Sequence, residues 1–227
     1  MRAIIMGGTS GIGLATAERL TKDVDVTITG RDPLKLAAAE GRFSSAVQLD
    51  STDREAVREF FDGFGLFEHL VLAFSPGAIG VGPIHDTSYT DIESAFNGKL
   101  FAYLHAIGCA QVTESITMIS AASARSAIPT TVVLAAVNGA IERMVSPLAA
   151  ELAPVRVNAV SPGVVDTPWW GFLSDEQRRE QFDEASATVP AGRVATADDV
   201  AAAVGYLTTA SMVTGAILPV DGGLTVA

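Results

Sequence analysis

Short apolar runs alternate with longer segments of helical spacing along the whole chain. Each apolar run is bounded by glycine, proline, aspartate or serine, which is typical of strands in a buried sheet. The predicted strands cover residues 3–6, 24–29, 46–49, 70–74, 115–119, 155–160 and 216–220. The predicted helices cover residues 11–21, 54–61, 91–110, 132–152 and 197–207, and a further helix begins at Pro33. Seven strands separated by helices predict an α/β fold with a doubly wound, seven-stranded parallel sheet.

No internal repeat, low-complexity tract or linker interrupts this pattern, so residues 1–227 are expected to form a single domain. The one long segment without a clear pattern is 168–193, and irregular segments of this kind often form lids over binding sites. Within it, Trp169 and Trp170 are expected either to close an apolar pocket or to pack against a neighbouring subunit. No apolar run without a glycine or a charge approaches the ~20 residues of a membrane helix, and the first strand begins almost at Met1. These two features predict a cytoplasmic protein without a targeting peptide or a membrane partner.

Composition narrows the class of protein further. Apolar residues make up 48% of the chain and charged residues 18%, which suits a sheet buried on both faces. The formal net charge of −11 argues against a nucleic-acid partner, because binding to phosphate backbones needs a basic surface. The single cysteine, Cys109, cannot form an internal disulfide, and no group of His, Cys and Asp has the spacing of a metal site. We therefore expect a small-molecule partner and no bound metal.

A glycine-rich turn follows the first predicted strand and opens the first predicted helix. Its sequence is Gly-Gly-Thr-Ser-Gly-Ile-Gly, residues 7–13. The first glycine allows a tight turn, and the later glycines let the backbone approach a pyrophosphate while the unpaired N–H groups of the helix face it. In this context the turn predicts a dinucleotide site. The candidate binding residues are Gly7, Thr9, Ser10, Gly11, Ile12 and Gly13.

The end of the second predicted strand indicates which dinucleotide binds. An acidic residue there would favour the ribose 2′-hydroxyl of NAD, but the position holds Gly30, and Arg31 follows it. A guanidinium can pair with the 2′-phosphate of NADP through two hydrogen bonds. Asp32 could instead serve NAD, but Pro33 follows it, so it is expected to cap a helix. The predicted cofactor is therefore NADP, with Arg31 as the ligand of its ribose phosphate.

Further motifs make the whole chain resemble the short-chain dehydrogenase/reductase family, whose members have a Rossmann fold. Besides the glycine turn, the resemblance rests on Leu49-Asp50, on residues 158–167 (Asn-Ala-Val-Ser-Pro-Gly-Val-Val-Asp-Thr) and on residues 190–193 and 219–223. The resemblance implies an oxidoreductase that assembles as a homodimer or homotetramer. It also implies further cofactor contacts, which are Asp50, Ser51, Ser75, Gly77, Pro162, Gly163, Val165 and Thr167.

Three catalytic positions of this family are vacant in the chain. Aligned on these motifs, the family's Ser, Tyr and Lys fall on Ala121, Leu134 and Asn138. The family's fourth residue, an Asn on the preceding helix, aligns with Lys99, although a two-residue slip would place Asn97 there. The positive charge lost at position 138 would then be restored from the neighbouring helix, and a partly desolvated amine could transfer protons. The candidate catalytic residues are Lys99, Asn138, and Ser120 beside the vacant Ser position.

Three functions remain compatible with these residues. The first is an NADP(H)-dependent oxidoreductase acting on a carbonyl or imine with atypical catalytic residues, because hydride transfer needs only a held nicotinamide and an oriented acceptor. The second is a non-redox isomerase or lyase with Lys99 as its base. The third is a catalytically silent NADP-binding protein. An assay with cofactor distinguishes the three. The first predicts turnover with consumption of cofactor, the second predicts turnover without it, and the third predicts binding without turnover.

Overall fold

The predicted strands form one parallel sheet of seven strands. In the computed structural model, which describes residues 1–226, the strand order is β3-β2-β1-β4-β5-β6-β9. The strands are β1 (Arg2–Met6), β2 (Asp25–Gly30), β3 (Ser45–Gln48), β4 (Phe67–Leu72), β5 (Val112–Ile119), β6 (Arg156–Pro162) and β9 (Ile217–Val220). The doubly wound α/β fold is therefore confirmed. The order reverses between β1 and β4, and sheets of this type bind ligands at the carboxyl ends of the strands beside such a point.

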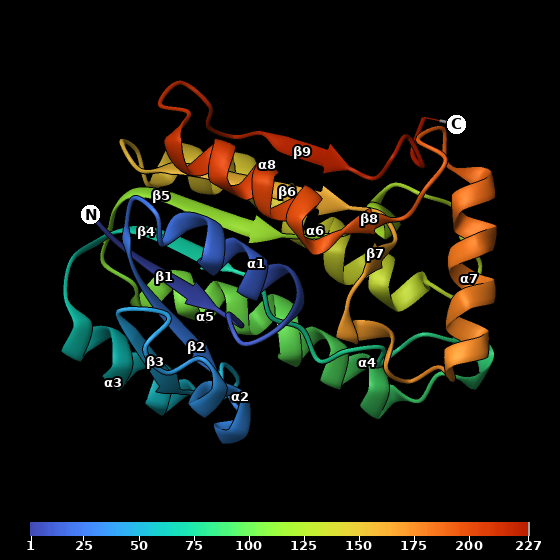
Figure 1. The fold of residues 1–227 in the computed structure, drawn as a ribbon, viewed down its shortest axis with the longest axis horizontal. Coiled ribbons are helices and arrows are strands. Elements are labelled where there is room, and N and C mark those ends of the chain that lie inside the picture. Colours follow the sequence, from blue (N-terminus) through green and yellow to red (C-terminus); the bar gives the residue numbers. More distant parts are fainter. Residues whose placement is uncertain (227) are drawn as a thin grey trace.

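Helices cover both faces of the sheet (Figure 1). One face carries α1 (Gly11–Leu20), α2 (Pro33–Ala38) and α8 (Ala197–Thr209), and the other carries α3 (Arg54–Phe64), α5 (Ala102–Cys109) and α6 (Val132–Glu151). Each face has its own apolar cluster, and the neighbouring residues Ile4 and Ile5 of β1 enter opposite clusters. Because successive side chains of a strand point to opposite faces, burial on both sides explains why the strands are continuously apolar.

The helix predicted at 91–110 is three consecutive segments. α4 (Tyr89–Ala95) continues into a π-helical turn, Phe96–Phe101, here called the π segment, which continues into α5. The wider winding occurs where Gly98 lies against Pro76, since a Cβ on Gly98 would lie 2.6 Å from the Pro76 Cβ. The π segment buries Lys99 and Leu100. Single π-helical turns inside α-helices are frequent at functional sites.

The prediction of an irregular segment at 168–193 is wrong, because most of it is the helix α7 (Asp175–Thr188). Only Ala185 of this helix is buried, so its sequence has no apolar period. Ser174 and Gln177 form a capping box at its start. Two short paired strands flank the segment, β7 (Val165–Asp166) and β8 (Ala195–Thr196), and single 3₁₀ turns cover Ile84–Asp86, Ala122–Ala124 and Pro168–Trp170.

One helix bears on the expectation about membrane segments, and it contains Gly139, Glu142 and Arg143. By length and composition α6 is long and apolar enough to cross a membrane. The same helix buries Val133, Val137, Ile141 and Val145 against the sheet. That packing accounts for its apolar sequence as that of a core helix.

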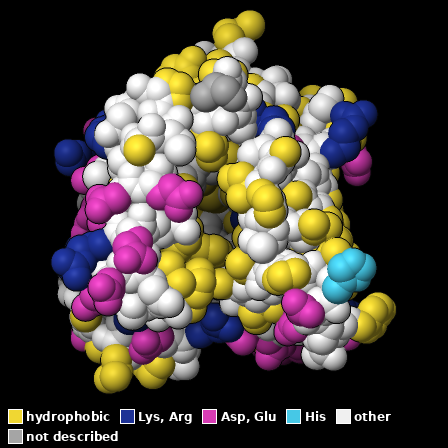
Figure 2. All heavy atoms as spheres, turned by 90° about the vertical axis from the view of Figure 1, so that its right-hand side faces the viewer, with side chains coloured by type: hydrophobic (Ala, Val, Ile, Leu, Met, Phe, Trp, Pro, Cys, Tyr) yellow, Lys and Arg dark blue, Asp and Glu magenta, His cyan; other side chains and the backbone are white. Residues whose placement is uncertain are grey.

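The strands end together at the edge of the sheet beside α7 (Figure 1). Figure 2 looks onto this edge and shows a hollow with hydrophobic side chains on its walls and acidic side chains on one side. The turns that leave β1, β4, β5 and β6 at this edge carry most of the predicted site residues.

Candidate active site

The glycine turn connects β1 to α1 at the carboxyl edge of the sheet. Gly7 has a φ of 84°, in the left-handed region, and a Cβ on Gly13 would lie 2.2 Å from the Gly7 carbonyl oxygen. The helix can leave the strand this closely only with glycine at both positions. Ser10 is the N-cap residue of α1, but its side chain accepts no capping hydrogen bond. Within residues 1–226, the first N–H groups of α1 therefore have no side-chain cap, which leaves them open to an anion.

Thr9 lies over Gly30 at the end of β2. A Cβ on Gly30 would lie 2.5 Å from Thr9 Cγ2 and 2.7 Å from Thr9 Oγ1, so Thr9 fills the space that an acidic side chain would need there. Arg31 is exposed directly after this position. The Asp32 carboxylate caps α2 by accepting hydrogen bonds from two N–H groups of its first turn, at 2.9 and 3.3 Å. The arginine, rather than the aspartate, is thus free to meet a ligand.

Asp50 and Ser51 follow β3. The Asp50 carboxylate accepts hydrogen bonds from the Thr52 N–H group at 2.9 Å and from the Thr52 hydroxyl at 2.8 Å. Partial burial acts in the opposite direction, but these hydrogen bonds and the Arg31 charge hold the pKa of Asp50 below its ordinary value. Asp50 is therefore an oriented, ionised carboxylate at neutral pH. Ser51 is buried beside it.

Two further turns lie at the same edge. After β4, the Ser75 hydroxyl accepts a hydrogen bond from the Gly77 N–H group at 3.3 Å. After β6, Thr167 approaches the glycine turn, since a Cβ on Gly11 would lie 3.4 Å from the Thr167 Cβ. Gly163, next to Pro162, packs against Asp221 at the end of β9, and Val165 is buried. The structure therefore brings the turns after β1 and β6 together at one end of the sheet.

The three candidate catalytic residues converge. Lys99 Nζ donates a hydrogen bond to Asn138 Oδ1 at 2.7 Å and another to the Ser120 carbonyl oxygen at 3.4 Å. Asn138 Nδ2 donates to the Leu134 carbonyl oxygen at 2.9 Å and to the Ser123 hydroxyl at 3.2 Å. These donor contacts fix the orientation of the amide, so its oxygen faces the amine. Lys99 is only 9% exposed.

The Lys99 amine is buried without an ion pair among the described side chains. This burial lowers the pKa of Lys99 from 10.5 to about 7. The Tyr103 ring lies nearby, with its centroid 6.0 Å from Nζ. Burial raises the pKa of Tyr103 far above its ordinary value, although its hydroxyl contacts backbone carbonyl oxygens. Lys99, rather than Tyr103, therefore changes its protonation state near neutral pH.

A buried carboxylate behind these residues was missed in the sequence. Glu142 Oε1 accepts hydrogen bonds from the Ser120 hydroxyl at 2.9 Å and from the Ser161 hydroxyl at 2.7 Å, and Oε2 lies 3.2 Å from Arg125 Nε. The Ser120 hydroxyl thus contacts Glu142, and only its carbonyl oxygen contacts the amine. The available signal was a lone carboxylate four residues after Asn138, which places both side chains on one side of the helix.

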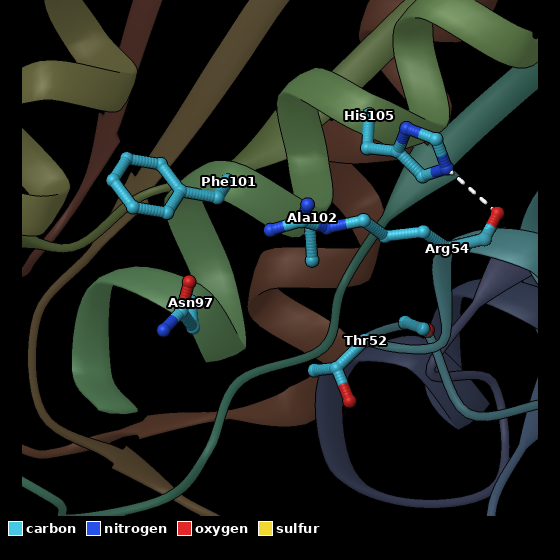
Figure 3. Close-up of a pocket in the computed structure, with 7 residues that line it drawn as sticks. Thr52, Arg54, Asn97, Phe101, Ala102 and His105 are labelled. Carbon is cyan, nitrogen blue, oxygen red and sulfur yellow. Dashed lines mark hydrogen bonds between the residues drawn. The ribbon is translucent and has the colours of Figure 1, made fainter. Parts of the chain in front are cut away.

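Asn97 lies on a different side of the π segment from Lys99. It lines a separate pocket of about 180 Å³ at the turn after β3 (Figure 3). The other lining residues are Ser51, Thr52, Arg54, Phe101, Ala102 and His105. The His105 ring is held there by a 2.9 Å hydrogen bond between its Nε2 and the Arg54 carbonyl oxygen. Of the two residues that the sequence left open, Lys99 is the one that contacts Asn138 and Ser120.

Aromatic side chains of α7 and of the turn after β6 pack against each other. The rings of Trp169 and Trp170 lie 4.8 Å apart, and Trp170 meets Phe182 of α7 edge-on at 5.8 Å. Trp170 Nε1 donates a hydrogen bond to the Val165 carbonyl oxygen at 3.0 Å. These contacts fix α7 beside the carboxyl edge. Within residues 1–226, no group of three or more His, Cys, Asp or Glu side chains is placed to hold a metal ion.

Several known proteins of similar sequence are named as dehydrogenases or reductases. The family model described as enoyl-(acyl carrier protein) reductase matches residues 7–225. A cis-4-hydroxycyclohexanecarboxylate dehydrogenase from Sinomonas cyclohexanicum is 29% identical over 98% of this chain and 96% of its own length. A 2-(S)-hydroxypropyl-CoM dehydrogenase from Xanthobacter autotrophicus is 31% identical over 97% of this chain and 95% of its own length.

Solved structures with a similar fold include proteins of the same class as these sequence relatives. A small-chain dehydrogenase in complex with NADPH has a TM-score of 0.86 at 29% identity, over 100% of this chain and 99% of that one. A short-chain dehydrogenase/reductase family protein has a TM-score of 0.88 at 30% identity, over 100% of this chain and 98% of that one. With the matching fold and the family model over nearly the whole sequence, this chain belongs to the short-chain dehydrogenase/reductase family of oxidoreductases.

Proposed function

We propose that the protein is an NADP(H)-dependent oxidoreductase that acts on a small carbonyl or imine compound through an atypical lysine–asparagine pair. The observation that carries this proposal is the 2.7 Å hydrogen bond from Lys99 Nζ to Asn138 Oδ1. The family has tyrosine and lysine on α6, where this chain has Leu134 and Asn138. Lys99 supplies, from the π segment, an amine that those positions lack, and near neutral pH this amine exists in both its charged and its neutral form.

The choice of NADP rests on the end of β2. Thr9 fills the space that an acidic ligand of the ribose hydroxyl would occupy, and Arg31 is exposed next to it. The uncapped N–H groups of α1 and the close passage of Gly13 fit a pyrophosphate. A relative of the same fold has been solved in complex with NADPH. When bound, the nicotinamide would supply or accept the hydride, which no side chain can do.

Lys99 handles the proton that accompanies hydride transfer. Because its pKa lies at about 7, both protonation states are well populated near neutral pH, which is the condition that favours a general acid or base. Asn138 Oδ1 and the Ser120 carbonyl oxygen hold the amine in place. An imine that arrives already protonated needs no acid, so imines suit this site as well as carbonyls.

A kinetic comparison tests the proposal. Lys99→Met, Lys99→Arg and the exposed control Lys35→Met are assayed with NADPH against panels of carbonyls and imines. We expect wild type to consume NADPH with at least one compound, and Lys99→Met to lose about a hundredfold or more in kcat, the usual contribution of a general acid. Lys35→Met should retain wild-type rates. Equal turnover by Lys99→Met would remove Lys99 from the mechanism.

A silent NADP-binding protein is the second candidate, and one observation favours it. The Ser120 hydroxyl is held by Glu142, and Leu134 offers no proton donor, so neither position presents a hydroxyl to a carbonyl oxygen. The same assay separates the candidates. Binding of NADPH without any turnover would support the silent protein, whereas product without loss of NADPH would support the non-redox use of Lys99 as a base.

We also propose that the protein assembles as a homodimer or homotetramer through α5 and α6. Large apolar side chains are exposed on this side of the molecule, with Phe101 48%, Leu104 44% and Val132 53% exposed. Burial of such side chains against a second copy would remove an apolar surface from water.

A further inference from the structure

The lysines of this chain differ sharply in their surroundings. The sequence contains Lys22, Lys35 and Lys99 and no others. Lys22 and Lys35 are exposed, whereas Lys99 is buried in the candidate active site. Besides the α-amino group of the chain, the protein therefore has one buried lysine amine and two exposed ones that serve as internal controls.

The contacts of the Lys99 amine suit its neutral form. An ammonium has three N–H donors, whereas the described hydrogen-bond acceptors of Nζ are two, Asn138 Oδ1 at 2.7 Å and the Ser120 carbonyl oxygen at 3.4 Å. The Tyr103 ring centroid, 6.0 Å from Nζ, lies at the outer limit of a cation–π contact. A neutral amine has two N–H donors and one lone pair, so both donors are satisfied and the lone pair needs no protein partner. Asn138 cannot offer a donor instead, because its amide nitrogen is held by the Leu134 carbonyl oxygen and the Ser123 hydroxyl.

The charged groups around the amine do not hold it as an ammonium. Glu142, the buried carboxylate on α6, accepts from Ser120 and Ser161 and pairs with Arg125. Tyr103 on α5 keeps its proton, because burial raises its pKa. Burial also lowers the pKa of Lys99 to about 7. Compared with an ordinary lysine of pKa about 10.4, the fraction of free amine at neutral pH is larger by roughly three orders of magnitude.

We propose that Lys99 is a nucleophile that binds small aldehydes and ketones covalently as Schiff bases. The Nζ lone pair forms a bond to the carbonyl carbon as the C=O π bond breaks, and one proton of the amine passes to the oxygen to give the carbinolamine. The second amine proton then passes to this oxygen, the C–O bond breaks, and water leaves to give the imine. One amine and one carbonyl give one imine and one water, and nothing is oxidised or reduced. The reaction goes beyond hydride transfer and needs no nicotinamide, so this proposal and the proposed function can fail separately.

Reductive trapping tests the proposal on the purified protein without cofactor. The protein is incubated near neutral pH with cyclohexanone or benzaldehyde and sodium cyanoborohydride, which reduces a protein imine selectively to a stable secondary amine. Intact mass and peptide mapping then locate the adduct. Peptide mapping separates any adduct on the α-amino group of the chain from those on lysines. We expect one lysine adduct, on Lys99, that is lost in Lys99→Met and kept in Lys22→Arg and Lys35→Arg. Labelling of Lys22 and Lys35 at the same rate as Lys99, or none at Lys99, would overturn the proposal.

Asn138→Asp provides a matched variant that keeps the lysine. The substitution exchanges the amide for a carboxylate of the same shape, 2.7 Å from the amine in the native geometry. An ion pair favours the ammonium and raises the pKa, so trapping near neutral pH should fall at least tenfold and recover as the pH is raised. A residue with a purely structural role would not give this recovery. Unchanged trapping by a folded Asn138→Asp protein would count against the neutral amine as the reacting form.

Discussion

Burial of the Lys99 amine links the stability of the fold to pH. The pKa of Lys99 is about 7 in the folded protein and about 10.4 in an unfolded chain. Between these values the unfolded state binds more protons, so the free energy of unfolding rises with pH, by at most about 1.4 kcal/mol per pH unit. The free-energy cost of burying the protonatable amine is fully present below pH 7. It is relieved above about pH 10.4, the pKa of lysine in the unfolded chain.

Lys99→Met has no such titration. The free energy of unfolding of wild type, minus that of Lys99→Met, should therefore increase between about pH 7 and pH 10. Chemical denaturation at several pH values measures this difference. Lys35→Met, at an exposed position, is the control and should show no trend. A difference that stays flat with pH would mean that Lys99 keeps its ordinary pKa.

Arg31 is expected to decide the choice of dinucleotide. Removing a charge-assisted hydrogen bond costs about 1.5–3 kcal/mol, so Arg31→Ala should weaken NADPH binding by roughly 10- to 100-fold and leave NADH binding nearly unchanged. Fluorescence titration of both cofactors measures this. Arg58→Ala, an exposed arginine that pairs with Glu55 on α3, is the control. Equal affinity of wild type for the two cofactors would contradict the assignment.

Residue types in a sequence identify candidates, but they do not fix their hydrogen-bond partners. Alignment with the family could predict that this chain has lysine at position 99, where the family has asparagine, and asparagine at position 138, where the family has lysine. The choice between Lys99 and Asn97, in contrast, depended on the winding of the π segment. Glu142 was missed because its partners, Ser120, Ser161 and Arg125, come from separate segments that only the folded sheet brings together.

At the scale of elements, α7 shows where apolar patterning fails. The helix buries Ala185 alone, so nothing in its sequence repeats with a helical period. The signal was instead at its start, where Ser174 and Gln177 have the spacing of a capping box. Strands and core helices were predictable because burial requires apolar residues, which a surface helix does not.

The capping boxes of α7 and α8 give a paired prediction. Ser174→Ala should speed hydrogen exchange in the first turn of α7 with little change in melting temperature, because the helix contributes little to the core. Thr196→Ala removes the matching cap of α8, which buries Val200 and Val204, and should lower the free energy of unfolding by about 1 kcal/mol. Equal effects of the two substitutions on global stability would contradict this account.

At the scale of the whole molecule, the parallel sheet was predictable from alternation alone. Seven buried strands need helices on both faces, and only strand–helix alternation supplies such crossovers. The strand order and the hollow at the carboxyl edge follow from the three-dimensional connections, which no local pattern contains.

Assembly is the prediction that belongs to this scale. Wild type should sediment as a dimer or tetramer at micromolar concentration, and Phe101→Glu combined with Leu104→Glu should shift it towards the monomer, because each buried charge would be unpaired. Leu66→Glu, at an exposed position before β4, should leave the assembly unchanged. A monomeric wild type in analytical ultracentrifugation would contradict the proposed interface.

The π segment sets the angular position of Lys99 around the helix axis, and the chemistry of the site depends on that position. An α-helix turns by about 100° per residue, and the π turn at Phe96–Phe101 adds residues without adding a turn. A chain shorter by one residue here would wind as a continuous α-helix and rotate Lys99 relative to α5. Every functional side chain would still be present in the sequence, yet the amine would no longer face Asn138. A residue count, as much as residue identity, thus specifies this site.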